Sequence, residues 1–159
     1  MGLFFSTFVN KVDRKGRVSV PATFRAALEG SSFPGVILFR SFRLPALDGS
    51  GIDRMEELSA RIDALDEFSE DREALSSIFA DAQQLPFDGE GRIILPEALS
   101  AHAGITETAA FVGLGRTFQI WEPQSFEKHQ QDLRERARRQ GTTLPSRRPD
   151  LPAPERPRS

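Results

Sequence analysis

The chain contains no cysteine and no tyrosine, and only two of its 159 residues are histidines. The absence of cysteine excludes a disulfide framework, a cysteine-ligated zinc site and a cysteine nucleophile. The histidines, His102 and His129, lie far apart in the sequence without a cluster of acidic ligands, so neither is predicted to bind a metal ion. No apolar run approaches the roughly 18 residues that a membrane-spanning helix needs. We therefore expect a cytoplasmic protein that binds no metal and does not cross a membrane.

Motifs typical of catalysis are also missing. The glycine-containing segments 89–91 and 113–115 lack the lysine and the helix start of a phosphate-binding loop. The segment 49–51 lacks the flanking residues of a nucleophile elbow. The carboxylates of residues 53–73 are explained more simply as the solvated face of a helix than as acid–base pairs. The sequence predicts a protein that is not an enzyme, with no catalytic residues, no cofactor and no small-molecule substrate.

Charge of either sign is abundant but unevenly distributed. The chain carries 21 Lys and Arg against 23 Asp and Glu, and its formal net charge of −2 argues against a uniformly basic nucleic-acid-binding protein. Residues 1–25 nevertheless have a net charge of +4, residues 53–73 of −6 and residues 134–159 of +5. The last segment also has five prolines and almost no apolar side chains, which predicts a disordered basic tail from residue 141. Charge blocks therefore describe this chain better than its net charge.

A repeat organises the rest of the chain. The ten residues 12–21, VDRKGRVSVP, recur 75 positions later as residues 87–96, FDGEGRIILP. The identical positions are Asp13 and Asp88, Gly16 and Gly91, Arg17 and Arg92, and Pro21 and Pro96. Since the apolar positions also match in type, the repeat indicates a duplicated unit, and this duplication decides the expected fold.

The same elements are predicted after each copy. The repeated prolines begin short helices over 22–29 and 97–103, each followed by a glycine. An apolar strand comes next, and a last strand is placed at Phe42–Leu44 in the first half and at Phe118–Ile120 in the second. One unit alone is too small to build much of a core, so the two units are expected to interlock their strands as a closed β-barrel.

Three further helices are predicted from apolar residues at helical spacing. Two of them lie between the halves, where acidic residues fill the other helix faces. The third begins at Pro123 and extends to about Arg139, with Phe126 and Leu133 expected to face inward. The predicted architecture is therefore α+β.

The turn inside each repeat has a physical explanation. Gly16 supplies the positive φ of a tight hairpin, and Asp13 opens the turn through its side-chain acceptor and lies close enough to pair with Arg17. Stabilisation of the hairpin alone would explain why these three residue types are present. Arg14 and Lys15, however, occupy the tip, where ordering a cation serves no packing purpose, and an arginine fork suits phosphate or guanine. The second copy has Gly89 and Glu90 at its tip, so the first hairpin is the better candidate for binding an anion.

The repeated Asp-x-x-x-Arg motif, with glycine before the arginine and proline four residues after it, resembles the MraZ family of bacterial transcriptional regulators. The segment 113–122, GLGRTFQIWE, resembles the same family. The resemblance covers about residues 1–135, in order and with family spacing. It implies a pseudo-symmetric swapped-hairpin β-barrel built from two tandem AbrB-like units, with helices between and after them. The Arg/Pro tail has no counterpart in it.

The resemblance also implies a function. It implies sequence-specific binding to double-stranded promoter DNA, at repeated sites upstream of the regulator's own operon for cell division and cell-wall synthesis. Ring-like homo-oligomers and a cytoplasmic, nucleoid-associated location are implied as well. By motif match, Arg17 is the arginine most closely tied to DNA contact, and Arg92 is its counterpart. The full set of DNA-binding candidates is Lys11, Arg14, Lys15, Arg17 and Arg92, with Asp13, Gly16, Asp88 and Gly91 as structural turn residues.

Five segments are expected along the chain. They are a first SpoVT-AbrB-like half at 7–54, a helical insert at 55–82, a second half at 83–126, a C-terminal helix at 127–140 and a disordered Arg/Pro tail at 141–159. A second function remains open, in which the same barrel is an oligomeric interaction module, antitoxin-like or a scaffold, that does not act primarily on DNA.

Overall fold

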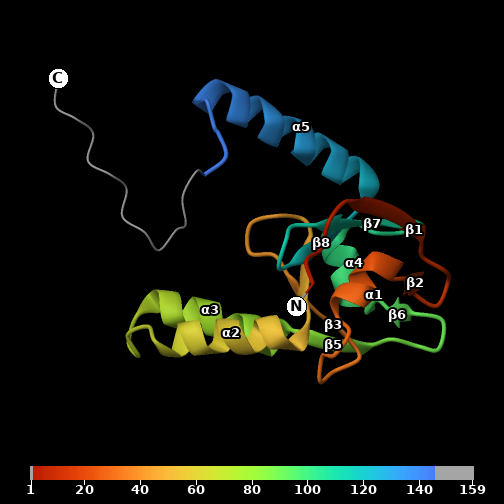
Figure 1. The fold of residues 1–159 in the computed structure, drawn as a ribbon, viewed down its shortest axis with the longest axis horizontal. Coiled ribbons are helices and arrows are strands. Elements are labelled where there is room, and N and C mark those ends of the chain that lie inside the picture. Colours follow the sequence, from red (N-terminus) through yellow and green to blue (C-terminus); the bar gives the residue numbers. More distant parts are fainter. Residues whose placement is uncertain (1, 146–159) are drawn as a thin grey trace. The chain divides into compact units, whose positions relative to one another are not determined.

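The structure is a computed structural model that describes residues 2–145 (Figure 1). The predicted disordered tail falls mostly on residues 146–159 and lies outside the described residues. The elements, in chain order, are β1 Thr7–Lys11, β2 Arg17–Ser19, α1 Ala22–Ala27, β3 Gly35–Arg40, β4 Leu47–Ser50, α2 Ile52–Asp63, α3 Glu70–Asp81, β5 Gln83–Pro86, β6 Arg92–Ile94, α4 Glu97–Ala103, β7 Thr108–Gly113, β8 Phe118–Trp121 and α5 Pro123–Gln140. Strands and helices are thus mixed, and every paired strand is antiparallel.

The strands form two sheets. Six strands make one sheet in the order β1-β7-β8-β4-β3-β5, and β2 and β6 make a second sheet of two strands. Each strand of the first half pairs with a strand of the second: β1 pairs with β7, β3 with β5, β4 with β8 and β2 with β6. This confirms that the two halves interlock.

The pairing also follows the repeat. Exchanging each element with its counterpart, β1 for β5, β2 for β6, β3 for β7 and β4 for β8, turns the β1–β7 pair into the β5–β3 pair and the β3–β4 pair into the β7–β8 pair. The β2–β6 and β4–β8 pairs map onto themselves. The duplication seen in the sequence therefore reappears as two-fold pseudo-symmetry in the strand order.

Two hairpins connect the sheets. The edge strands β1 and β5 of the larger sheet continue through tight turns into β2 and β6, and one isolated bridge, Val12 with Val18, joins β1 to β2. The regular pairing of the described residues stops there, in two separate sheets, so a closed barrel stays a prediction.

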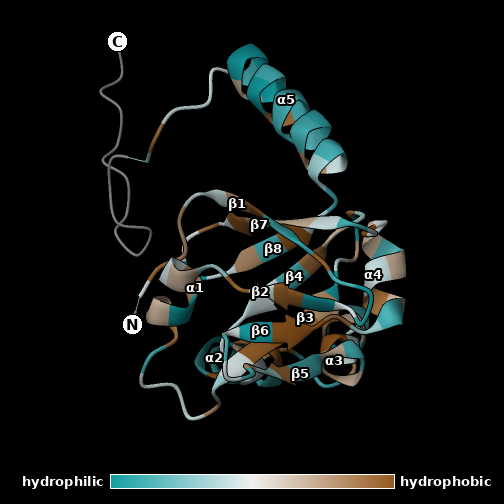
Figure 2. Cartoon of the chain, turned by 90° about the vertical axis from the view of Figure 1, so that its right-hand side faces the viewer, coloured by the Kyte–Doolittle hydropathy of each residue, from teal (hydrophilic) through white to brown (hydrophobic). Residues whose placement is uncertain are grey.

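The core lies between the sheets and the short helices. Val18 and Val20 of the first repeat and Ile93 and Leu95 of the second are almost fully buried. An aromatic cluster fills the centre, with Phe24 of α1 in edge contact with rings of the large sheet. In Figure 2 the hydrophobic colour is concentrated on the sheet strands, whereas helix α5 is largely hydrophilic.

The helices α2 and α3 form the insert between the halves and cover the outer face of β3. Ile37 of β3, Met55 of α2 and Ile78 of α3 are buried against one another there. Ser69 is the N-cap of helix α3, and its Oγ accepts a hydrogen bond of 3.0 Å from Arg72 N. Asp81, near the end of α3, accepts hydrogen bonds from Arg40 N and Arg40 Nε, both at 2.9 Å. The hydrogen bonds between Arg40 and Asp81 thus fasten the insert to β3.

The last strand of the first half is not where the repeat predicts it. Residues 42–44 form a loop, and the counterpart of β8 is β4, which begins at Leu47. Pro45 explains the shift, since proline cannot donate to a central ladder. The loop is instead closed by two hydrogen bonds, from Leu44 N to Ser41 Oγ at 3.2 Å and from Ser41 N to Ala46 O at 3.0 Å.

Two helix predictions also need correction. Helix α1 ends at Ala27, two residues earlier than predicted, and turns follow it as far as Gly30. Helix α5 begins at Pro123 as predicted, but Leu133 is 44% exposed rather than directed inward. Leu133 belongs to a second unit, which begins at Lys128.

Candidate nucleic-acid interface

The first hairpin turn is held by a single carboxylate. Asp13 Oδ1 accepts hydrogen bonds from Lys15 N and Arg17 N, both at 2.9 Å, and Asp13 Oδ2 accepts one from Arg17 Nε at 2.6 Å. The backbone adds bonds from Asp13 N to Arg17 O and from Gly16 N to Asp13 O, each of 3.0 Å. Gly16 has φ +83°, a conformation that L side chains rarely adopt, and an added Cβ would lie 3.0 Å from Leu95 O. The predicted Asp13–Arg17 pair is therefore present and rigidly connected to the turn.

The second turn repeats this geometry. Asp88 Oδ1 accepts from Glu90 N and Arg92 N at 2.9 Å, and Asp88 Oδ2 accepts from Arg92 Nε at 2.8 Å. Gly91 has φ +75°. The second arginine has an additional partner, because Arg92 Nη1 lies 3.6 Å from Glu90 Oε2. Asp88 and Gly91 thus have the same geometry as Asp13 and Gly16, whereas Arg92 lies between two carboxylates.

The two turns lie side by side. The hydrogen bond from Leu95 N to Gly16 O measures 2.8 Å, and the one from Val20 N to Gly91 O measures 3.1 Å, so each turn is bonded to the strand beyond the other. Figure 1 shows both turns at the same side of the molecule, beyond β2 and β6, and Figure 2 views the β2–β6 pair from that side. The motifs, 75 positions apart in sequence, form one continuous surface.

The candidate basic side chains of this surface differ in their hydrogen-bond and ion-pair partners within the protein. Lys11, Arg14 and Lys15 are exposed, and within residues 2–145 their side chains form no ion pair or hydrogen bond. Arg17 Nε donates a hydrogen bond to Asp13, and the rest of the Arg17 guanidinium has no protein partner in the described part of the chain. Arg92 is surrounded by acidic neighbours. The surface is therefore electrostatically asymmetric, with its unneutralised positive charge on the first hairpin.

Two residues that support the hairpins were not predicted from the sequence. Asn10 Nδ2 donates a hydrogen bond of 2.7 Å to Ser19 O and so ties β1 to β2. Arg25 Nε donates one of 3.2 Å to Val20 O, and the Arg25 guanidinium covers the buried Gly91 so closely that a Cβ there would lie 2.6 Å from Arg25 Cζ. Neither residue repeats in the other half, so the duplication gives no signal for them.

The carboxylates of the turns have shifted pKa values. The backbone N–H of Arg17 lowers the pKa of Asp13 below its ordinary value of 3.8, and the backbone N–H of Arg92 does the same for Asp88. Hydrogen bonds to the ionised form cause both shifts. The pKa of the Arg92 guanidinium is raised, chiefly by the side-chain hydrogen bond from Arg92 Nε to Asp88 Oδ2.

These shifts predict an acid-sensitive pair of hairpins. A carboxyl whose pKa is lower in the folded state stabilises the fold above its unfolded pKa, and this contribution is lost as the pH falls through the folded value. Replacing both acids, Asp13→Asn with Asp88→Asn, is expected to destabilise the protein at neutral pH and much less at a pH far enough below 3.8 that both carboxyls are protonated in the folded state as well. Urea unfolding of both proteins at the two pH values measures this difference.

The matched control is Asp71→Asn, which removes an exposed carboxylate of α3 away from the turns. Its stability should follow the pH profile of the unchanged protein. An equal loss of stability at both pH values in the double variant would contradict the assigned hydrogen bonds.

The described residues offer neither a metal site nor a membrane-spanning helix. No group of three or more His, Cys, Asp or Glu side chains there could hold a metal ion. No helix of that part of the chain is long and apolar enough to span a bilayer. His102 Nε2 lies 3.1 Å from Leu44 O, which fastens α4 to the 41–46 loop.

Comparison with known proteins gives consistent matches. The family described as "MraZ protein, putative antitoxin-like" matches residues 78–145. A protein named "Transcriptional regulator MraZ" from Rickettsia akari is 49% identical over 145 residues, covering 91% of this chain and 97% of the relative. Proteins of the same name from Rickettsia felis and Rickettsia rickettsii are 48% and 52% identical over 145 and 130 residues. They cover 91% and 81% of this chain and 97% and 87% of the relatives.

Proposed function

Because the chain belongs to the MraZ family, we propose that it is a transcriptional regulator that binds double-stranded DNA and is not an enzyme. The name of its relatives supports the regulatory role. The observation that carries the DNA contact is the asymmetry of the hairpin surface, where Arg14 and Lys15 occupy an exposed tip without carboxylate partners among residues 2–145. Unpaired cations on a projecting turn are suited to phosphate, and an arginine fork also fits the acceptors of guanine.

Within this surface we assign the residues different roles. Arg14, Lys15 and Lys11 contact phosphate, and Arg17, oriented by Asp13, directs its outer N–H groups to a base edge or phosphate. Arg92 contributes less than the repeat suggests, because Asp88 and Glu90 already neutralise it. Asp13, Gly16, Asp88 and Gly91 act through the shape of the turns.

The finer proposals concern assembly and location. One hairpin offers few cations, so its DNA affinity is expected to be weak and dependent on salt. A ring-like homo-oligomer would present several hairpins to repeated promoter sites upstream of the protein's own cell-division and cell-wall operon. The acidic insert would face away from DNA, since its carboxylates repel phosphate. Such a regulator would act in the cytoplasm, on the nucleoid.

We further propose that β2 and β6 complete a swapped-hairpin barrel. The interlocked pairing of the halves and the Val12–Val18 bridge support it. We also propose that the chain is divided into the five segments expected from the sequence, at residues 7–54, 55–82, 83–126, 127–140 and 141–159.

The deciding experiment uses the full chain and a labelled duplex from upstream of its own gene. Fluorescence anisotropy over a salt series should show tighter binding than to a scrambled duplex, with an affinity that falls as salt rises. Arg17→Ala is expected to weaken specific binding by roughly tenfold, since one good arginine contact to a base provides about that discrimination.

The control is Arg61→Ala, which removes an exposed arginine of α2 that has no ion pair among residues 2–145. It should leave the affinity unchanged. If Arg17→Ala keeps the oligomeric state and binds the upstream duplex as tightly as the unchanged protein, the assignment of this hairpin is wrong. Absence of measurable binding to either duplex would favour the interaction module as the function.

A further inference from the structure

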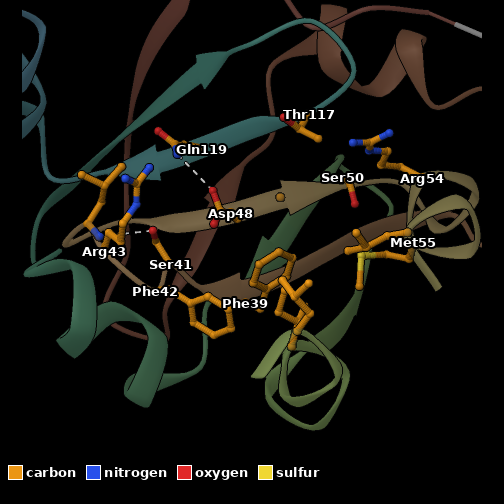
Figure 3. A pocket seen from close by; sticks show the side chains of 15 residues that line it. Phe39, Ser41, Phe42, Arg43, Asp48, Ser50, Arg54, Met55, Thr117 and Gln119 are labelled. Carbon is orange, nitrogen blue, oxygen red and sulfur yellow. Dashed lines mark hydrogen bonds between the residues drawn. The ribbon is translucent and has the colours of Figure 1, made fainter. Parts of the chain in front are cut away.

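A cleft lies between the helical insert and the outer face of the large sheet, away from the hairpins. Its volume is about 390 Å³, and residues of β3, β4, β8, α2, α3 and the 41–46 loop line it (Figure 3). Along β4, Leu47 belongs to the core inside the sheet, so the alternation of side chains directs Asp48 and Ser50 to the cleft. The size is within the roughly 300–1,000 Å³ typical of small-molecule sites.

The floor of the cleft holds polar atoms that protein groups do not fully satisfy. The Ser50 side chain is 3% exposed, and its Oγ has no hydrogen-bond partner in the described part of the chain. Asp48 Oδ1 accepts a bond of 3.0 Å from Gln119 Nε2, and no cation lies within ion-pair distance of this carboxylate among residues 2–145. Burial raises the pKa of Asp48 above its ordinary value. Because Ser50 Oγ lacks a hydrogen-bond partner and Asp48 lacks a cation, the two side chains favour a ligand that donates N–H groups.

The rim of the cleft carries positive charge. Arg43, on the 41–46 loop, is exposed and forms no ion pair within residues 2–145. Figure 3 shows its guanidinium on the same side of the cleft as Asp48. The other arginine of the lining, Arg54, is already paired with Glu57, with Nη1 and Oε2 3.2 Å apart. Arg43 is therefore the arginine of the lining that remains available to pair with an anionic group of a ligand.

The wall facing the floor is apolar. Met55 and Leu58 of α2, together with Leu75 and Ile78 of α3, supply it, and Phe39 of β3 closes the base. An alkyl or aromatic group would lose its contact with water there, which is favourable in proportion to the area covered.

We propose that this cleft binds a small zwitterion with an apolar side chain, a hydrophobic α-amino acid, as an effector. Its ammonium group donates to Asp48 and Ser50, its carboxylate pairs with Arg43, and its side chain packs on Met55 and Leu58. The ligand bridges the insert and the sheet. This site is separate from the hairpin surface and does not depend on the DNA-binding proposal.

The chain provides its own probe for binding. It has one tryptophan, Trp121, whose Nε1 donates a bond of 2.9 Å to Gln119 Oε1, and Gln119 in turn donates to Asp48. A ligand at Asp48 is expected to change the emission of Trp121. We would titrate the full-length protein with L-phenylalanine, with phenethylamine, which lacks the carboxylate, and with phenylacetate, which lacks the ammonium group. L-phenylalanine should bind about tenfold more tightly than either fragment, because each fragment loses one charge-assisted contact.

Two variants separate the contacts. Asp48→Asn should weaken L-phenylalanine and phenethylamine about tenfold and leave phenylacetate unchanged, whereas Arg43→Ala should weaken L-phenylalanine and phenylacetate and spare phenethylamine. The matched controls, Asp71→Asn and Arg61→Ala, change exposed residues of α3 and α2 outside the cleft lining and should leave all three affinities unchanged.

Three results would overturn the proposal. The first is no change of Trp121 emission, and no calorimetric heat, at millimolar L-phenylalanine. The second is binding of phenethylamine that equals or exceeds that of L-phenylalanine, which would mean that the carboxylate finds no partner. The third is L-phenylalanine binding that survives Asp48→Asn and Arg43→Ala.

Discussion

Reversing both charges at the tip of the first hairpin, with Arg14→Glu and Lys15→Glu, is expected to weaken DNA binding by about a hundredfold or more at low salt. Both side chains are exposed, and neither has a carboxylate partner within residues 2–145, so their charge is available to phosphate. The substitution removes two attractive contacts and places two negative charges against the duplex. The turn itself should persist, because Asp13, Gly16 and Arg17 form its bonds.

The measurement is fluorescence anisotropy with the upstream duplex at several salt concentrations. The slope of log affinity against log salt should fall together with the affinity, since fewer phosphates are neutralised. The second hairpin supplies the control: Glu90→Lys, at the position equivalent to Lys15, should keep or increase the affinity. A charge-reversed first hairpin that keeps the affinity and the salt slope would show that DNA contacts another surface.

The second large effect concerns stability, in the aromatic cluster of the core. Phe24 is fully buried, and its ring centroid lies 5.1 Å from that of Phe4, 5.4 Å from that of Phe118 and 5.8 Å from that of Phe8. Phe24→Ala should therefore lower the free energy of unfolding by about 3–5 kcal/mol, through lost burial and the cavity that remains. Helix α1 would lose the side chain that anchors it.

Urea unfolding followed by circular dichroism measures this loss. Phe68→Ala is the matched control, because Phe68 is 90% exposed and its removal should change stability by no more than about 0.5 kcal/mol. A loss below about 1 kcal/mol for Phe24→Ala would mean that the cluster collapses around the missing ring, contrary to the rigid packing described.

Much of the fold could be predicted because the repeat carries local signals. Pro96 and Gly104 mark the start and end of α4, where Gly104 has φ +66°. Gly16 and Asp13 mark the first turn, and their bonds occur as the residue types predict. Each of these features depends on neighbours within a few residues, so one segment of sequence contains the whole cause.

Features that depend on distant segments were harder to predict. The repeat placed a strand at Phe42–Leu44 because the residue types match Phe118–Ile120, but Pro45 excludes that segment from a central ladder. The actual strand, β4, is recognised by its pairing with β8 rather than by an apolar run, since Asp48 and Gly49 interrupt it. The local sequence of a strand predicts its turns but does not identify the strand with which it pairs.

The candidate sites divide in the same way. The bonds that join Asp13 to Arg17 were predicted from their spacing, whereas the neutralisation of Arg92 became visible only with the Glu90 contact in the structure. The cleft at Ser50 was not predicted at all. Its lining comes from two helices, three strands and a loop, and an isolated serine in a strand gives no signal of an unsatisfied hydroxyl.

The interlocked strand order also determines when the protein can fold during its synthesis. Strand β1 takes its ladder partner from β7 at residues 108–113, and β2 takes its partner from β6 at residues 92–94. A nascent chain that ends before these residues must keep the apolar sides of β1 and β2 uncovered. Contacts between such distant segments form slowly and leave the growing chain prone to aggregation. The ribosome must therefore release nearly the whole of the two halves before the first strand can find its ladder partner.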